Sequence, residues 1–67
     1  MRSNLKEFRK KLGLTQEEMG LLVNKRTKGQ WCNIEAGKRN FSAEDIVELG
    51  IKFNLSAKEL KRMMEDS

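Results

Sequence analysis

Residues 15–39 read TQEEMGLLVNKRTKGQWCNIEAGKR, and this stretch contains two helix starts in close succession. A hydroxyl residue opens each half, and an acid or amide follows three positions later: Thr15 with Glu18, and Thr27 with Gln30. In such a capping box the hydroxyl accepts a hydrogen bond from an unpaired backbone N–H, and the longer side chain bonds back to the cap residue. The stretch therefore predicts two short helices joined by a tight turn.

The same signals recur on both sides of this stretch. Further candidate starts are Ser42 with Asp45, Ser56 with Glu59 and, less typical in its residues, Asn4 with Glu7. Residues that tolerate the left-handed conformation of a helix end follow three of the segments: Gly13, Gly37 and Asn54. The chain is therefore expected to form five helices, at residues 4–12, 15–23, 27–36, 42–53 and 56–65.

Each expected helix carries one apolar stripe, and no segment alternates long enough to predict a strand. The stripe residues are Leu5, Phe8 and Leu12; Met19, Leu22 and Val23; Trp31 and Ile34; Ile46, Leu49, Gly50 and Phe53, with Val47 beside them; and Leu60, Met63 and Met64. We therefore predict an all-α fold, a compact bundle of about five short helices that forms a single domain over residues 1–67.

Composition excludes several classes of protein. The chain has 67 residues, no His and only Cys32, so an internal disulfide cannot form and a zinc site would lack its usual ligands. No apolar run reaches the ~20 residues that span a bilayer, and the N-terminus lacks the apolar segment of a signal peptide. No nucleophile has a partner base. We expect a cytoplasmic protein that is not an enzyme and has no cofactor, small-molecule ligand or membrane partner.

The two sides of the expected helix 27–36 differ in character. Trp31 and Ile34 point the same way at helical spacing, so we expect Trp31 to anchor the helix in the core rather than to stack on a ligand from an exposed position. The opposite side consists of small or uncharged residues: Gly29, Cys32, Asn33 and Ala36. A face with no long charged side chain can approach another surface closely.

Basic residues stand at both ends of this helix. The turn Asn24-Lys25-Arg26 is short enough that the two helices must cross steeply, and Gly20 allows their close approach; this is a helix-turn-helix arrangement. Lys25, Arg26 and Lys28 come at the N-terminal end, and Lys38 and Arg39 follow the C-terminal end. With a net charge of +4, such bracketing suits contact with phosphates on both sides of a DNA major groove. The alternative is that these are solvated loop charges.

Over about residues 4 to 60, the sequence resembles the Cro/repressor-type (lambda repressor-like) helix-turn-helix family. The residues that carry the resemblance are Arg9, Leu14, Thr15, Gln16, Glu18, Met19, Gly20, Val23, Ile34, Glu35, Gly37 and Lys38. The resemblance implies four or five helices, with the third in the major groove of double-stranded DNA. It further implies a transcriptional regulator, expected to be a repressor of phage or mobile-element type.

The resemblance also implies residue roles. Gln16 would contact phosphate and brace the third helix, and Arg9 would pair with Glu35. The residues implied in reading bases or adjacent phosphates are Thr27, Lys28, Gly29 and Asn33, and those in the phosphate-contacting loop are Lys38, Arg39 and Asn40. The turn is one residue longer than the common form, so these contacts could shift by one position. Gly29 provides either close backbone approach or weak base readout, and Cys32 is expected to be a small neutral filler rather than a redox site.

Family members often act as dimers, so we expect a homodimer, with Met64 and Phe41 as candidate exposed contacts. Two alternatives to sequence-specific binding remain open. One is a protein-interaction module on a helix-turn-helix scaffold, antitoxin-like or anti-repressor. The other is a basic architectural protein that binds any duplex.

Overall fold

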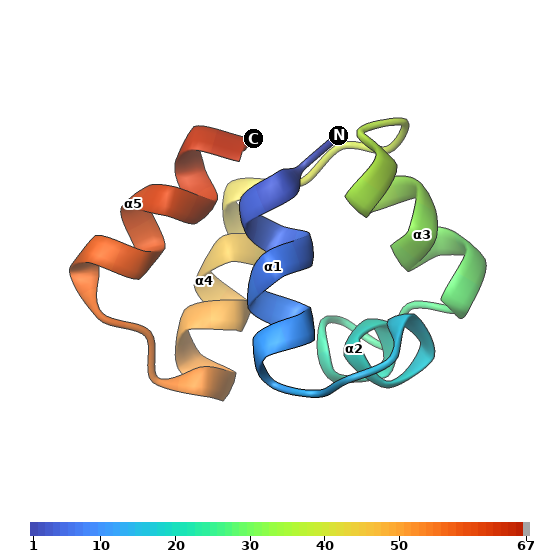
Figure 1. Cartoon of the computed structure of the whole chain (residues 1–67), viewed down its shortest axis with the longest axis horizontal. Helices are drawn as coiled ribbons and strands as arrows, with labels where there is room; N and C mark the ends of the chain where they lie inside the picture. The colour runs from blue at the N-terminus through green and yellow to red at the C-terminus, as the bar shows by residue number, and fades with distance from the viewer. Residues whose placement is uncertain (67) are drawn as a thin grey trace.

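Five helices make up most of the chain in a computed structural model that describes residues 1–66 (Figure 1). They are α1 (Ser3–Lys11), α2 (Gln16–Leu22), α3 (Lys28–Ala36), α4 (Ala43–Phe53) and α5 (Ala57–Asp66). No strand is present in the part of the chain that the structure describes. The predicted all-α fold is confirmed, and each helix lies within two residues of its expected range.

Hydrogen bonds at the helix starts explain this agreement. Full capping boxes open three helices, with both reciprocal bonds formed between Thr15 and Glu18, Thr27 and Gln30, and Ser42 and Asp45. At the start of α5, the Ser56 hydroxyl accepts from the backbone N–H of Glu59 at 3.3 Å. Left-handed residues close two helices: Gly37 ends α3 at φ +84° and Asn54 ends α4 at φ +50°.

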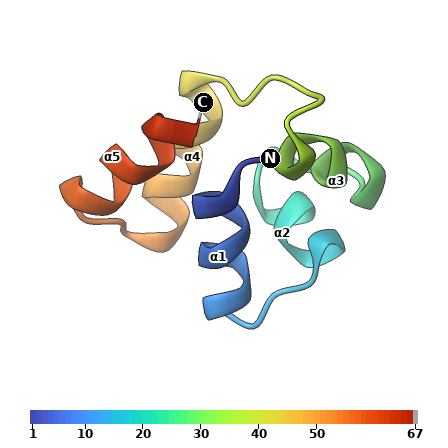
Figure 2. The same ribbon diagram turned by 45° about the horizontal axis from the view of Figure 1, so that its top comes forward.

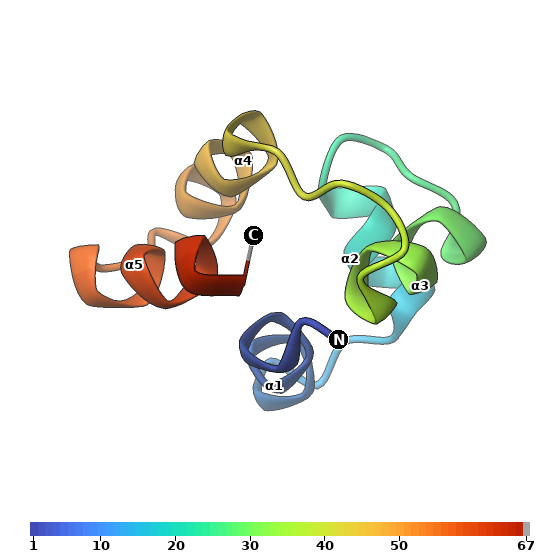
Figure 3. The same ribbon diagram turned by 90° about the horizontal axis from the view of Figure 1, so that it is seen from above.

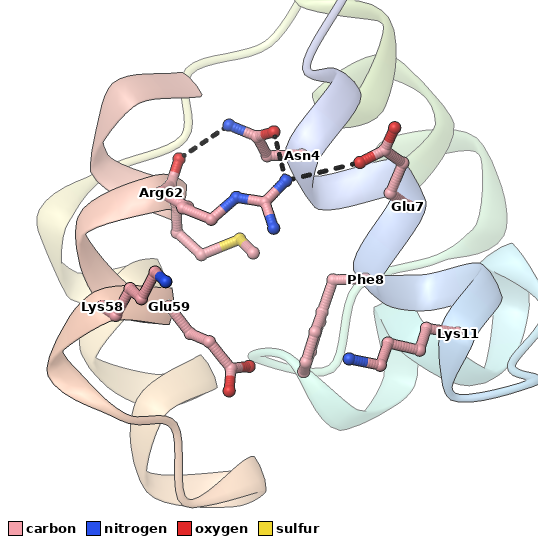
Figure 4. A pocket seen from close by; sticks show the side chains of 8 residues that line it. Asn4, Glu7, Phe8, Lys11, Lys58, Glu59 and Arg62 are labelled. Atoms are coloured by element: carbon pink, nitrogen blue, oxygen red, sulfur yellow. Dashed lines mark hydrogen bonds and ion pairs between the residues drawn. The ribbon is translucent and has the colours of Figure 1, made fainter.

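The expected cap at Asn4 is wrong, because α1 begins at Ser3 and its N-cap is Arg2. The Asn4 side chain instead bonds across to α5, where its amide donates to the Arg62 carbonyl and its oxygen accepts from the Arg62 guanidinium at 3.0 Å. Figure 4 shows these bonds in the shallow pocket between α1 and α5. The Asn4 side chain therefore forms hydrogen bonds with α5 instead of capping α1.

The core gathers one stripe from each helix. Its buried members are Leu5, Met19, Val23, Trp31, Ile34, Phe41, Ile46, Leu49 and Met63. Trp31 is fully buried, as predicted, and its ring meets that of Phe41 edge-to-face at 6.5 Å between centroids. The expectation that Phe41 is an exposed dimer contact is wrong, since this residue is only 1% exposed. It lies in the loop between α3 and α4, and its ring packs on Trp31.

Some stripe residues lie outside the core. Leu12 and Leu22, at the ends of α1 and α2, are 41% and 38% exposed, and Val47 is 58% exposed. Leu12 and Leu22 stand at helix ends that reach past the buried layer, whereas Val47 lies in the middle of α4, beside the buried stripe and toward solvent.

The two helices of the opening stretch pack on each other more extensively than any other pair. Figures 1 and 3 show α3 crossing α2 at one end of the molecule, with α5 at the opposite end. Gly20 of α2 lies beneath the start of α3 and is buried. A Cβ atom on Gly20 would lie 2.9 Å from the Arg26 carbonyl oxygen and 3.1 Å from the Trp31 Cβ. The lack of a side chain at residue 20 therefore sets how closely the two helices approach.

Candidate nucleic-acid interface

The outer face of α3 is exposed along its length. Lys28, Gly29, Cys32 and Asn33 are all exposed there, while Trp31, Ile34 and Glu35 on the inner side are buried. A Cβ on Gly29 would meet no atom within 4 Å, so residue 29 opens directly to solvent. Apart from Lys28 at its N-terminal end, the face carries only small or uncharged side chains and no acidic group, as the sequence predicts.

A buried carboxylate fixes α3 to the two preceding helices. Glu35 is 3% exposed and accepts hydrogen bonds from Arg9 of α1, Gln16 of α2 and Trp31 of α3 itself. The Arg9 Nε and Trp31 Nε1 atoms both lie 2.6 Å from Glu35 Oε2, and the Gln16 amide lies 3.3 Å from Oε1. Three helices therefore meet at one side chain, and the predicted pairing of Arg9 with Glu35 is confirmed.

Gln16 thereby takes the bracing role that the resemblance implies. Its side chain is half-buried at the first residue of α2, where its amide donates to Glu35. The backbone N–H groups of a helix start add partial positive charge there, which favours an approaching phosphate. Glu17 follows directly and is exposed, so the start of α2 is less basic than the turn before α3.

A second buried carboxylate holds the turn before α3. Asp45, 2% exposed at the start of α4, accepts from Arg26 at 2.6 Å and from the Asn24 amide at 2.7 Å. It also accepts from the backbone N–H of Ser42 in its capping box. The expected phosphate contact by Arg26 needs revision, because its side chain is only 16% exposed and its guanidinium is engaged with Asp45. We therefore treat Arg26 as a residue that positions the turn.

The pKa of Asp45 predicts how acid affects the fold. Burial opposes ionisation of this carboxyl, but hydrogen bonds from Arg26, Ser42 and Asn24 outweigh it and lower the pKa below the ordinary 3.8. Because the folded pKa lies below the unfolded one, the ionised group stabilises the fold fully above about pH 4, and this stabilisation is lost as pH falls through the folded pKa.

We expect the urea midpoint to drop between about pH 4 and pH 2, and the Asp45→Asn variant to be less stable at neutral pH with a flatter acid profile. The comparison is made by far-UV circular dichroism on both proteins across that range. The variant retains an acid slope from other carboxylates, including Glu18, whose pKa its bonds with Thr15 lower. Parallel profiles for the two proteins would contradict the role given to Asp45.

The turn itself adopts an uncommon backbone conformation. Asn24 and Lys25 are consecutive non-glycine residues with positive φ, +61° and +52°. The Arg26 N–H then donates to the Gly20 carbonyl at 2.7 Å, which closes the turn on α2. Left-handed conformations in non-glycine residues cost about 1 kcal/mol or more each, so the surrounding bonds must hold them in place. Lys25 is exposed two residues before Thr27, the N-cap of α3, and lines a hollow between α2 and α4 that also includes Leu21 and Glu48.

The loop after α3 carries the second basic group. Lys38, Arg39 and Asn40 are exposed, and the backbone N–H groups of Lys38 and Arg39 both donate to the Asn33 carbonyl. Arg2 fastens the loop from the other side, since its guanidinium donates to the Arg39 carbonyl at 2.7 Å and lies over the Phe41 ring. The loop is therefore held at the C-terminal end of α3 by its own backbone and by the N-terminus (Figure 2).

The structure brings most of the predicted site residues to one helix and its flanks. Those exposed there are Lys25, Thr27, Lys28, Gly29, Asn33, Lys38, Arg39 and Asn40. Sequence reasoning gave no role in shaping the site to Arg2, Asn24 or Asp45. The capping box identified Asp45 as a helix-start residue, but no local signal indicated that it also anchors the preceding turn.

Within residues 1–66, no group of three or more Cys, Asp or Glu is placed to hold a metal ion, and no helix is long and apolar enough to cross a membrane. Comparison with models of known protein families, with curated proteins and with solved structures finds no match to this chain.

Proposed function

We propose that this protein binds double-stranded DNA through the outer face of α3 and acts as a transcriptional regulator of the Cro/repressor type, as a repressor. One observation carries the proposal: an exposed helix face without acidic side chains that begins at Lys28 and is followed by the exposed Lys38 and Arg39, with the exposed Lys25 in the turn before it.

The dimensions of α3 support this proposal. Nine residues at 1.5 Å rise make the helix about 13.5 Å long, close to the ~12 Å width of the major groove. With the helix in the groove, basic groups just beyond its two ends would be able to reach the phosphate strands that border the groove. The Glu35 and Asp45 networks hold the helix rigidly against α1, α2 and α4, so little ordering would accompany binding.

The exposed side chains divide into two roles. Asn33 can bond to both N6 and N7 of adenine, and Lys28 can donate to guanine O6 or N7, so these two are the proposed base readers. Lys25, Thr27, Gln16 and the loop residues Lys38 to Asn40 would contact phosphates and fix the register. Gly29 and Cys32 between them let the helix backbone approach the base edges.

A titration of isotope-labelled protein with duplex DNA, followed by NMR at two salt concentrations, tests the proposal. Amide shifts at Gln16, residues 25–33 and residues 38–40 that fade at higher salt would support it, because displaced counterions make phosphate contact salt-dependent. Absence of shifts at low salt would refute it and favour the protein-interaction alternative. Identical affinity for all duplexes, after selection from a random-sequence pool, would indicate an architectural binder instead.

Two single substitutions separate the proposed roles. Asn33→Ala is expected to lower affinity for the selected site by ~10-fold or more and to leave binding to random duplex nearly unchanged, because it removes a base contact. Lys38→Ala is expected to weaken binding to both duplexes alike and to reduce the salt slope by about 0.9. Fluorescence anisotropy on both duplexes at several salt concentrations measures these effects. Equal losses on both duplexes for Asn33→Ala would show that Asn33 does not read a base.

A further inference from the structure

The C-terminal end of α3 is closed by Arg2, the residue that precedes α1. Its backbone N–H donates to the Glu35 carbonyl at 2.8 Å, and its guanidinium Nη1 donates to the carbonyls of Ile34 at 2.5 Å and Arg39 at 2.7 Å. The last carbonyls of a helix lack partners within it, and positive charge is favourable at that end. One residue therefore bonds both to the last turn of α3 and to the loop that follows it.

Two further contacts hold Arg2 against the packed part of the fold. Its guanidinium carbon lies 5.7 Å from the centroid of the Phe41 ring, which is buried and packs on Trp31. Its carbonyl accepts from the Lys6 N–H in the first turn of α1 at 3.1 Å. Figures 1 and 2 show the N-terminus beside the C-terminal end of α3. Through Arg2, the loop after α3 is thus tied to both α1 and the core.

We propose that Arg2 is a positioning residue for DNA binding, which holds Lys38, Arg39 and Asn40 in the conformation that contacts phosphate. This inference rests on the proposed function and adds to it a residue that lies outside the exposed α3 face. The Arg39 carbonyl belongs to the peptide group that joins Arg39 to Asn40. The bond from Arg2 to this carbonyl therefore fixes the direction in which the loop leaves α3.

The advantage of this tie is that the loop is ordered before DNA arrives. Lys38 and Arg39 are exposed, and their backbone N–H groups share the Asn33 carbonyl at 2.9 and 3.1 Å. Those bonds lie at the start of the loop, whereas the Arg2 bond holds the loop further along. A loop that is already ordered loses less conformational entropy on binding, so its phosphate contacts contribute more to affinity. Arg2 also offsets the partial negative charge at the end of α3, which would oppose an approaching phosphate.

Hydrogen exchange followed by NMR tests the tie without DNA. Arg2→Met keeps an unbranched apolar side chain beside Phe41 but removes the guanidinium donor, and the Lys38 and Arg39 amides should exchange ~10-fold faster. Arg2→Lys keeps the positive charge and one donor nitrogen, so its exchange should lie between the two. Arg62→Met is the matched control: it removes an equal charge from α5, where Arg62 bonds to Asn4, and should leave loop exchange unchanged. Far-UV circular dichroism checks that each variant is folded.

A double-variant comparison then connects the tie to DNA binding. Arg2→Met should weaken binding to a random-sequence duplex by ~10-fold, because two long side chains must then be ordered on binding. In a Lys38→Ala/Arg39→Ala background the same substitution should cost less than about twofold, since the loop contacts are already lost. Arg62→Met should cost less than about twofold in both backgrounds. Fluorescence anisotropy at low salt measures all of these affinities.

The possible failures are distinguishable. Equal losses from Arg2→Met in both backgrounds would overturn the inference, because a residue that contacts DNA itself acts independently of the loop. Unchanged loop exchange in Arg2→Met, or faster exchange with unchanged DNA affinity, would overturn it too and leave the proposed function intact. A wild-type protein that binds no duplex at low salt would refute the proposed function, and the role of Arg2 in DNA binding with it.

Discussion

Glu35→Ala is expected to leave the protein largely unfolded at room temperature. Removing one partner of a buried ion pair costs about 3–5 kcal/mol, because the remaining charge loses its bonds. A single core of this size supplies about 3–5 kcal/mol of net stability, so the loss is comparable with the whole. Here the substitution strands the half-buried Arg9 guanidinium and the buried Trp31 N–H, both of which donate to Glu35 at 2.6 Å.

The measurement is urea unfolding followed by Trp31 fluorescence, since this is the only Trp in the chain and its indole bonds directly to Glu35. Glu7→Ala is the matched control, because Glu7 is exposed and contacts Arg62 only at 3.5 Å; we expect a change below about 1 kcal/mol. The double variant Arg9→Met/Glu35→Met should be less destabilised than the sum of its single variants. A Glu35→Ala protein within ~1 kcal/mol of wild type would show that the network contributes little.

Gly20→Ala is expected to destabilise the fold by about 1–3 kcal/mol, although alanine is the better helix former. The added Cβ would lie 2.9 Å from the Arg26 carbonyl oxygen and 3.2 Å from that of Thr27. Backbone atoms cannot rotate away, so α3 and the turn before it must shift. DNA binding, if the proposal is right, should weaken as well, because the same shift moves Lys25 and Lys28.

Two other helical glycines provide controls for this prediction. Gly29→Ala meets no atom within 4 Å and should stabilise the protein by up to about 1 kcal/mol. Gly50→Ala would meet the Leu60 Cδ2 at 2.9 Å, the end of a flexible side chain, so its effect should fall between the other two. Thermal unfolding by circular dichroism gives the order directly. Any order in which Gly20→Ala is not the least stable would contradict the close-packing argument.

Local features of the sequence account for the helices. Capping pairs such as Thr27 with Gln30 act across three positions, and their hydrogen bonds form as expected. The apolar stripes are also local, since neighbours on one helix face are three or four residues apart, and they correctly predict that Trp31 and Ile34 are buried. The pairing of Arg9 with Glu35 did not come from such local features; it came from the resemblance.

Errors arose where a residue had two possible partners at different ranges. Asn4 is a suitable cap, but bonds to Arg62 of a helix 58 positions away engage its side chain. Arg26 belongs to a basic cluster in the sequence, yet its guanidinium reaches Asp45, 19 positions on. Phe41 stands in a polar loop and has no helical period, so nothing nearby indicated that it would pack on Trp31.

Caps and amphipathic periods act within three or four residues of the chain, so the number of helices, four of their starts and their inner faces follow from local sequence. Which polar groups face outward depends instead on how the helices pack. Packing α4 against the turn removed Arg26 from the basic face and buried Asp45, and packing α5 on α1 and α4 left Val47, Ile51 and Met64 exposed around one groove. Those outcomes depend on how whole helices meet, since burial and long-range ion pairs arise from positions that are distant in the chain.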